Sequence, residues 1–370
     1  MIYLDYQATT PLAPEAREAM MPWLAGPEAM GALAESRTQS CGWANPHSAH
    51  RAGRAAAAAV EMARDQVAAL LPPGGRVVFT SGATEALNLA IVGSGARKLA
   101  VSAIEHAAVL DTARAVDPGL CVLPVGPDGL VDAEVVIPDG TELIAVMQVN
   151  NEIGTIQPVA RLAERARAMG ALFLCDAVQG AGKLAAPEGA DLIAVSSHKL
   201  YGPKGIGALW VRDGVDLSPL IHGGGQEGGL RSGTLSPALC AGFGAAAALC
   251  TTLWESDGEH VERLWTQARA LFADWTLNGS AEWRWHGNIN VRLDGLDVAR
   301  LLSECRTVAF SAGSACASGS GRTSHVLRAI GLSDREARNA IRLGFGRYTK
   351  AEELEKAAAA INAAAWSQRV

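Results

Sequence analysis

Residues 191–199 have the sequence DLIAVSSHK, an apolar run that ends in small hydroxyls, a histidine and a lysine. The residues that follow, LYGPKGIG, predict a turn, because proline and glycine disfavour a helix there. The run therefore predicts a buried strand with Lys199 at its end. A buried ammonium is costly, whereas an amine bonded to the carbonyl of a cofactor avoids that cost. The alternative is a surface lysine that closes a strand, and Lys199 alone favours this alternative.

The same strand-like composition recurs along the chain, at intervals that leave room for helices. The other apolar runs are VVFT (77–80), LAVS (99–102), CVLP (121–124), LIAV (143–146), LFLC (172–175) and GALW (207–210). Helical stretches such as 85–91 and 159–169 lie between several of them. This alternation predicts an α/β fold with a mostly parallel seven-stranded sheet, covered by helices on both faces. In such sheets, ligands bind beyond the carboxyl ends of the strands.

The last third of the chain predicts a second, smaller unit. Residues 236–254 form an alanine-rich apolar segment that proline and glycine interrupt, which favours a buried helix over a membrane span. We expect a large domain over residues 14–250. Residues 1–13 together with 251–370 are expected to form a small α+β domain that carries the loop with Cys316.

The composition predicts a soluble globular enzyme. The chain has 370 residues, 49% of them hydrophobic, and a formal net charge of −6. No basic run offers a surface for nucleic acid, and residues 1–6 lack the features of a signal peptide, so we expect a cytoplasmic protein. The seven cysteines show no C-x-x-C spacing, which argues against a metal site and a disulfide framework and favours a reducing compartment.

Polar residues that follow the predicted strands are candidates for a ligand site. The segment TSGATE (80–85) opens a helix and could cradle a phosphate with its backbone N–H groups, or could simply cap that helix. Asp176 needs a cationic partner if it is buried, or else caps a turn. His106 could stack on a flat ring and move protons, although a lone histidine is more often structural. Asn150 and Asn151 could bind a carboxylate or build a tight turn.

Lys199, Asp176 and the segment 80–85 together match the needs of pyridoxal 5'-phosphate. The phosphate of this cofactor needs a cradle, its ring nitrogen needs an acid, and its aldehyde needs an amine. We therefore predict that the protein binds pyridoxal 5'-phosphate.

Two further residues, Cys316 and Arg342, indicate a reactive thiol and a binding site for a substrate carboxylate. Cys316 lies in FSAGSACASGSG (310–321), a stretch of small residues that predicts a mobile loop and a reactive thiol. The alternative is an accidental cysteine, and Cys305 and Cys41 are the next candidates. Arg342 alternates with apolar neighbours on a strand-like run, where an inward-facing guanidinium would suit capture of a substrate carboxylate. An outward-facing arginine fits the same pattern.

These residues resemble those of the cysteine desulfurases, enzymes of the class-V aminotransferase-like family that have pyridoxal-phosphate fold type I. The matching motifs follow the family order through almost the whole chain: LDYQATTP (4–11), NPHSAH (45–50), TSGATE (80–85), EH (105–106), NNEIG (150–154), DAVQ (176–179), SSHK (196–199), YGPKG (201–205), HGGGQE (222–227), RSGT (231–234) and SAGSAC (311–316). The SAGSAC form, with more glycine and serine behind it, resembles the branch that serves iron–sulfur cluster assembly.

The resemblance implies an activity and its catalytic residues. A desulfurase removes sulfur from L-cysteine, leaves L-alanine and passes the sulfur as a persulfide to an acceptor protein. Lys199 would form the imine with the cofactor and move the α-proton. His106 would stack on the ring and assist proton transfer, and Cys316 would attack the substrate sulfur.

The resemblance also implies the binding residues of a homodimer. Asp176 would pair with the ring nitrogen of the cofactor, and Gln179 would bond its phenolic oxygen. Asn151 and Arg342 would hold the substrate carboxylate. The implied phosphate ligands are the backbone of Ala83, the side chains of Thr84, Ser196 and His198, and Thr234 from the other subunit.

Some positions depart from the family pattern, and other activities compete with the predicted one. Val178, Gln148 and Gly228 stand where a hydroxyl residue, a histidine and an arginine are common in the family.

A selenocysteine lyase or an aminotransferase would use the same cofactor, but an aminotransferase would not need Cys316. A binding protein without activity would not need Lys199, Cys316 and His106 together. The sequence leaves open whether an iron–sulfur scaffold, an activator or a tRNA-thiolation enzyme accepts the sulfur.

Overall fold

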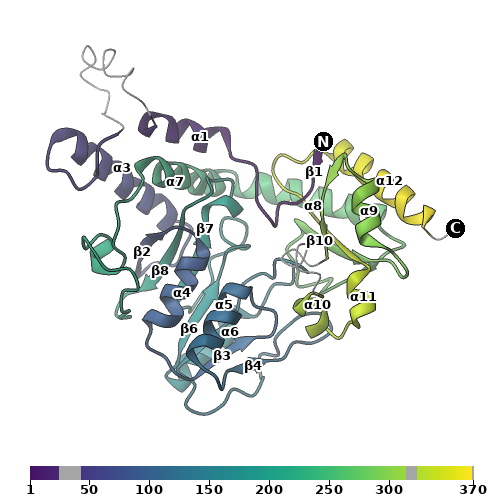
Figure 1. The fold of residues 1–370 in the computed structure, drawn as a ribbon, viewed down its shortest axis with the longest axis horizontal. Coiled ribbons are helices and arrows are strands. Elements are labelled where there is room, and N and C mark those ends of the chain that lie inside the picture. The colour runs from purple at the N-terminus through teal and green to yellow at the C-terminus, as the bar shows by residue number, and fades with distance from the viewer. Residues whose placement is uncertain (25–42, 314–322, 369–370) are drawn as a thin grey trace.

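A computed structural model describes residues 1–24, 43–313 and 323–368 of the chain (Figure 1). The predicted nucleophile Cys316 and the candidate Cys41 lie outside these residues. Figure 1 shows a larger body built around a central sheet and a smaller body beside it, on which both ends of the chain lie.

Seven strands form the central sheet in the order β2-β8-β7-β6-β5-β3-β4. Their bounds are β2 Gly75–Thr80, β3 Leu99–Ser102, β4 Cys121–Leu123, β5 Leu143–Ala145, β6 Leu172–Asp176, β7 Leu192–Ser196 and β8 Gly207–Arg212. Neighbouring strands from β7 to β4 are parallel, whereas β8 is antiparallel to both β2 and β7. The predicted α/β fold with a mostly parallel seven-stranded sheet is confirmed, and each predicted apolar run contains a strand.

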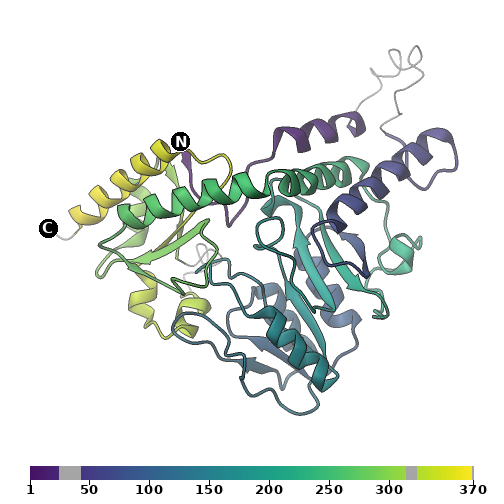
Figure 2. The same cartoon turned by 180° about the vertical axis from the view of Figure 1, so that it is seen from behind.

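The strands are apolar on both faces because helices cover both faces (Figures 1 and 2). In β7, Ile193 and Val195 belong to one hydrophobic cluster, and Leu192 and Ala194 belong to another. The first cluster also takes residues from α1 (Pro14–Met20), α3 (Arg51–Ala68), α6 (Val159–Met169) and α7 (Pro237–Thr252). The second takes residues from α4 (Ala83–Gly93) and α5 (Ala107–Val116). Short 3₁₀ segments are η1 (Met21–Trp23), η2 (Ser197–Lys199) and η3 (Glu227–Gly229).

The smaller body contains an antiparallel sheet of order β12-β13-β10-β9. Its strands are β9 Thr276–Leu277, β10 Asn288–Arg292, β12 Ser311–Ala312 and β13 Ala340–Gly344. Beside it, β1 (Ile2–Tyr3) pairs in parallel with β11 (Val308–Ala309). The helices are α8 Trp254–Leu271, α9 Val298–Glu304, α10 His325–Ala329, α11 Asp334–Arg338 and α12 Ala351–Ser367. Leu4 packs in one cluster with residues of α8, α9 and α12. The division of the chain at residue 250 stays a prediction.

Helix α7 is a core helix that packs against α1 and α3. Among the described residues, no single helix is both long enough and apolar enough to cross a membrane. Helices α7 and α8 pass that test only as a pair, and they are bent by 75° at their junction.

Candidate active site

A cavity of about 600 Å³ lies where strands of the central sheet end. This volume is typical of sites for small molecules and cofactors. Ten residues predicted from the sequence line the cavity: Ala83, Thr84, His106, Asn151, Asp176, Gln179, Ser196, His198, Lys199 and Arg342. Residues far apart in sequence therefore meet at the edge of the sheet that the strand pattern indicated.

Lys199 enters the cavity from η2, directly after β7. Its Nζ donates hydrogen bonds to the carbonyl oxygens of Gln7 (2.5 Å) and Ala8 (2.8 Å). The turn behind it is tight, because the Gly202 N–H donates to the Ser197 carbonyl (3.0 Å) and a Cβ at Gly202 would lie 2.1 Å from Ser197 Oγ. The amine is therefore held against the N-terminal segment by a turn that requires glycine.

Asp176 is the last residue of β6, and 6% of it is exposed. Its Oδ1 accepts the backbone N–H of Val178 at 2.9 Å. Burial raises the pKa of Asp176 above its ordinary value, while His106, the Val178 N–H and Lys199 act in the opposite direction. A cation placed against this carboxyl group would offset the cost of its burial. The position therefore suits a protonated ring nitrogen.

His106 both caps a helix and lines the cavity, so the two roles that the sequence left open are compatible. Its Nδ1 accepts the backbone N–H of Ala108 at 3.1 Å, at the start of α5. Because Nδ1 accepts, a neutral imidazole carries its proton on Nε2.

The start of α4 forms another wall of the cavity. Its N-cap, Gly82, has no side chain to bond the N–H groups of the first turn, so Ala83 and Thr84 begin a helix whose N–H groups can bind an anion. A Cβ at Gly207 would lie 2.7 Å from the Gly82 carbonyl carbon. Glycine at this position of β8 therefore lets the start of α4 approach the sheet.

Ser196 and His198 approach the same cavity from the end of β7. Burial, followed by the charges of Lys199 and Lys204, lowers the pKa of His198 to about 4. The ring is therefore neutral at neutral pH, and its Nδ1 lies 3.1 Å from Thr9 Oγ1. A neutral imidazole can donate a hydrogen bond to a phosphate oxygen through its N–H. Because the pKa of His198 is about 4, its ring does not change its charge near pH 7.

Gln179 is buried and incompletely hydrogen-bonded. Its Nε2 donates to the Gln7 carbonyl oxygen at 2.9 Å, and its Oε1 has no hydrogen-bond partner among the described residues. A buried amide with spare bonding capacity is expected to bond a ligand. Of the departures from the family pattern, Val178 lines this cavity, whereas Gln148 lies outside its wall and donates to the Ala185 carbonyl at 2.8 Å.

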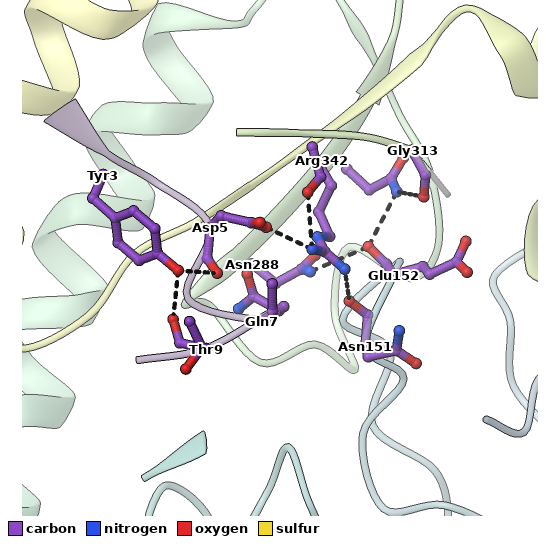
Figure 3. A network of polar contacts seen from close by, with 12 residues as sticks. Tyr3, Asp5, Gln7, Thr9, Asn151, Glu152, Asn288, Gly313 and Arg342 are labelled. Carbon is purple, nitrogen blue, oxygen red and sulfur yellow. Dashed lines mark hydrogen bonds and ion pairs between the residues drawn. The ribbon is translucent and has the colours of Figure 1, made fainter. Parts of the chain in front are cut away.

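Arg342, in β13, is fully buried and lines the cavity, so the inward orientation is the observed one (Figure 3). Its Nη2 lies 2.6 Å from Asp5 Oδ1, and its Nη1 donates to the Asn151 carbonyl oxygen at 3.0 Å. Asn150 instead builds the turn, since its Oδ1 accepts the N–H groups of Glu152 and Ile153 at 2.9 Å each. Asn150 therefore builds the tight turn, and Asn151 lines the cavity.

Two buried acids near the site were not singled out from the sequence. Glu105 Oε1 accepts from Ser102 Oγ (2.5 Å) and from the Met147 N–H (2.7 Å), and burial raises the pKa of Glu105 to about 8. Glu152 Oε2 accepts from Ser324 Oγ at 2.5 Å, and burial raises the pKa of Glu152 to about 7. Glu105 follows an apolar strand and precedes His106, a position that could have indicated burial.

Replacing Glu105 with glutamine is expected to stabilise the fold at high pH. In the unfolded chain Glu105 ionises near its ordinary pKa of about 4.3. The folded state keeps the proton until about pH 8, so this residue makes the folded state less stable as pH rises from about 4.3 to 8. The Glu105→Gln variant keeps an acceptor for Ser102 and Met147. Because glutamine does not ionise, this position no longer lowers the free energy of unfolding as pH rises. Its free energy of unfolding should exceed that of the unaltered chain by roughly 1–3 kcal/mol at pH 8.

Urea unfolding at pH 5 and pH 8 checks this expectation. The free energies of unfolding of Glu105→Gln and the unaltered chain should differ little at pH 5 and much more at pH 8. The control is Glu164→Gln, a surface carboxylate on α6, which should show no such pH dependence. Equal differences at both pH values would contradict a neutral Glu105 in the folded protein.

Of the predicted site residues that the structure describes, one does not line the cavity. Thr234 is exposed, in a segment where Arg231 Nε lies 2.8 Å from Glu85 Oε1 on α4. Cys316 lies outside the described residues. Conversely, Asp5, Gln7 and Ala8 contact Arg342, Lys199 and Gln179, although the sequence offered them only as part of a motif.

The cavity has the groups that pyridoxal 5'-phosphate requires. The start of α4, Ser196 and His198 could hold its phosphate, Asp176 its ring nitrogen, and Lys199 its aldehyde. The unpartnered oxygen of Gln179 and the raised pKa of Asp176 both indicate side chains whose bonding is completed by a ligand. No cluster of three or more potential metal ligands occurs in the part of the chain that the structure describes.

Comparisons with known proteins agree with this arrangement. The family model "Aminotransferase class-V" matches residues 2–357. The chain is 40% identical to "Cysteine desulfurase IscS" of Rickettsia rickettsii (strain Iowa) and of Rickettsia bellii (strain OSU 85-389), over 96% of this chain and 89% of each relative. Among solved structures, a "NIFS-LIKE PROTEIN" is 29% identical with a TM-score of 0.85, and the alignment covers 98% of both chains. "SspA in complex with cysteine" is 35% identical with a TM-score of 0.78, covering 95% of this chain and 100% of that one.

Proposed function

Because this chain belongs to the class-V aminotransferase family, we propose that it is a cysteine desulfurase acting in the cytoplasm as a homodimer. It converts L-cysteine to L-alanine with the help of pyridoxal 5'-phosphate, and passes the sulfur to an acceptor protein. The observation that carries this proposal is the single cavity that combines the amine of Lys199, the buried carboxyl group of Asp176 and the buried guanidinium of Arg342. The free cysteines Cys121, Cys175, Cys240, Cys250 and Cys305 suit a reducing compartment.

The cofactor is proposed to be bound by residues at or just after the ends of four strands, β2, β3, β6 and β7, and by one residue of the second subunit. Asp176 would pair with the ring nitrogen, Gln179 would bond the phenolic oxygen, and His106 would stack on the ring. The phosphate would be held by the backbone of Ala83, by Thr84, Ser196 and His198, and by Thr234 of the second subunit. When bound, the cofactor supplies an electron sink that stabilises negative charge at the substrate α-carbon.

The side chains of this chain bind the substrate and move its protons. Arg342 and Asn151 bind the α-carboxylate, and a guanidinium can do so through two parallel hydrogen bonds. Lys199 Nζ takes the α-proton, and the carbonyl oxygens of Gln7 and Ala8 orient the protonated amine. His106 Nε2 is the atom at which a proton can be held beside the reacting groups, because Nδ1 is committed to the Ala108 N–H.

The sulfur is transferred to Cys316. The Cys316 thiolate attacks the sulfur of bound cysteine, the carbon–sulfur bond breaks, and a sulfur–sulfur bond forms. In balance, L-cysteine and the Cys316 thiol become L-alanine and a Cys316 persulfide, without an external oxidant. The outer sulfur of the persulfide is then transferred to an acceptor such as an iron–sulfur scaffold, an activator or a tRNA-thiolation enzyme.

Mass spectrometry of the protein after addition of L-cysteine tests this proposal. The peptide that contains Cys316 is expected to gain the mass of one sulfur atom. In Cys316→Ala this gain should disappear, and alanine formation should fall at least about tenfold, because the nucleophile is removed. The matched control is Cys305→Ala, which removes a buried thiol at the end of α9 and should keep the mass gain.

Three outcomes would contradict the proposal. Alanine formation at an unchanged rate in Cys316→Ala would exclude the persulfide route. Release of an amino group to a keto acid acceptor would instead indicate an aminotransferase. Activity with selenocysteine but none with cysteine would indicate a selenocysteine lyase.

A further inference from the structure

The N-terminal segment Asp5–Ala8 connects two parts of the active site. At one end, the Asp5 carboxylate pairs with Arg342 (Figure 3). At the other end, the carbonyl oxygens of Gln7 and Ala8 accept hydrogen bonds from Lys199. This segment lies directly on β13, since the Gly344 N–H donates to the Leu4 carbonyl at 2.8 Å. A Cβ at Gly344 would lie 1.6 Å from Gln7 Oε1, so a side chain at this position would displace the Gln7 amide.

Arg342 depends on Asp5 for its charge balance and its orientation. The guanidinium is fully buried, and an isolated buried cation is strongly unfavourable. Asp5 Oδ1, 2.6 Å from Nη2, supplies the opposite charge, and the Asp5 side chain is 19% exposed. The Asn151 carbonyl (3.0 Å) and Ser311 Oγ (3.4 Å) accept from the same group. These contacts on both terminal nitrogens fix the plane of the guanidinium.

One part of the guanidinium has no bond in the described structure. The Arg342 Nε is buried and has no hydrogen-bond partner among the described residues, although Arg342 lines the cavity. A buried donor without a protein partner needs an acceptor, which a molecule bound in the cavity can supply. The orientation fixed by Asp5 therefore determines which N–H groups meet that ligand.

We propose that Asp5 is a positioning residue that orients Arg342 for the α-carboxylate of the substrate. This inference rests on the proposed function, in which Arg342 binds that carboxylate. Asp5 does not touch the substrate itself. Its carboxylate holds Nη2, so that the remaining N–H groups are aligned before the substrate arrives.

Inhibition of the cofactor-loaded enzyme by L-alanine and by L-alaninamide tests this proposal. Both compounds resemble the product, but only L-alanine has an α-carboxylate. In Asp5→Ala the inhibition constant for L-alanine should rise roughly tenfold, as expected for the loss of a charge-assisted hydrogen bond. The constant for L-alaninamide should change less than about twofold. In Asp5→Asn, which keeps an acceptor oxygen near Nη2 but loses its charge, part of the affinity for L-alanine should return.

The control for a merely structural ion pair is Asp257→Ala. Asp257 lies 2.7 Å from Arg347 and is 22% exposed, so the pair resembles that of Asp5 with Arg342 but lies outside the wall of the active-site cavity. This variant should affect thermal unfolding without changing the preference for L-alanine over L-alaninamide. If Asp5→Ala fails to fold, Asp5→Ser carries the same expectation, because its shorter side chain does not reach Nη2.

Several results would overturn the proposal. Equal changes for both inhibitors would mean that Asp5 only stabilises the fold. Tighter binding of L-alanine in both Asp5 variants would mean that its charge competes with the substrate. An unaltered protein that does not consume L-cysteine would instead refute the proposed function, which separates the two failures.

Discussion

Replacement of Lys199 by alanine is expected to abolish desulfuration, with a fall in turnover of at least about 10⁴-fold. The amine of Lys199 is the proposed attachment point of the cofactor and the proposed base for the α-proton, and general base catalysis alone contributes about 10²–10⁴-fold. The structure places Nζ in the cavity, where the carbonyl oxygens of Gln7 and Ala8 accept its hydrogen bonds.

The attachment itself is measured independently of turnover. Borohydride reduction of the purified holoenzyme fixes the cofactor covalently on the lysine that holds it, and peptide mapping then locates the label. The label is expected on Lys199 and should be absent from Lys199→Ala. The matched control is Lys204→Ala, which removes an exposed lysine from the wall of the same cavity and should leave the label on Lys199. A label on Lys204 or on any other lysine would contradict the assignment of Lys199.

The sheet was predictable from sequence because its strands are buried on both faces. A parallel strand between two layers of helices must be apolar throughout, so Leu192–Val195 and the other runs stand out as short continuous apolar segments. The polar residues at the ends of these strands, such as Asp176 and Lys199, could be predicted to share a site. The reason is that the carboxyl ends of parallel strands lie together at one edge of the sheet.

The contacts that orient these residues were not predictable in the same way. Asp5 and Arg342 are separated by 337 positions, and Gln7 and Lys199 by 192. Pairs this distant leave no periodic pattern in one sequence. The raised pKa values of Glu105 and Glu152 also depend on complete burial by several elements, and a local sequence pattern does not reveal that burial.

Short motifs also did not resolve which of two adjacent residues has which task. Asn150 and Asn151 have the same side chain. Only the path of the folded backbone places Asn150 in the turn and Asn151 at the cavity. At His106 the difficulty is different, because the same residue caps α5 through Nδ1 and lines the cavity. A histidine that caps a helix through one ring nitrogen can still line a cavity, and a sequence pattern does not show this.

Replacement of Asp176 by asparagine is expected to lower turnover by about 10²–10³-fold and to weaken retention of the cofactor. A carboxylate against a protonated ring nitrogen stabilises that charge in a buried site, where one unit of pKa corresponds to about 1.4 kcal/mol. Asparagine keeps the size of the side chain and an acceptor for the Val178 N–H but removes the negative charge. Retention is measured as the fraction of cofactor that remains after gel filtration, and turnover as alanine formation.

The control for this variant is another buried aspartate of the same sheet. Asp191, like Asp176, is 6% exposed, but it lies before β7 rather than at the end of a strand. Its Oδ2 accepts the Phe173 N–H, and its Oδ1 lies 2.7 Å from Arg212 Nε. Asp191→Asn should therefore reduce the free energy of unfolding while cofactor retention and turnover change less than about twofold. If the two variants lose turnover to the same extent, the effect of Asp176 lies in the stability of the sheet and not in the charge that it presents to the cavity.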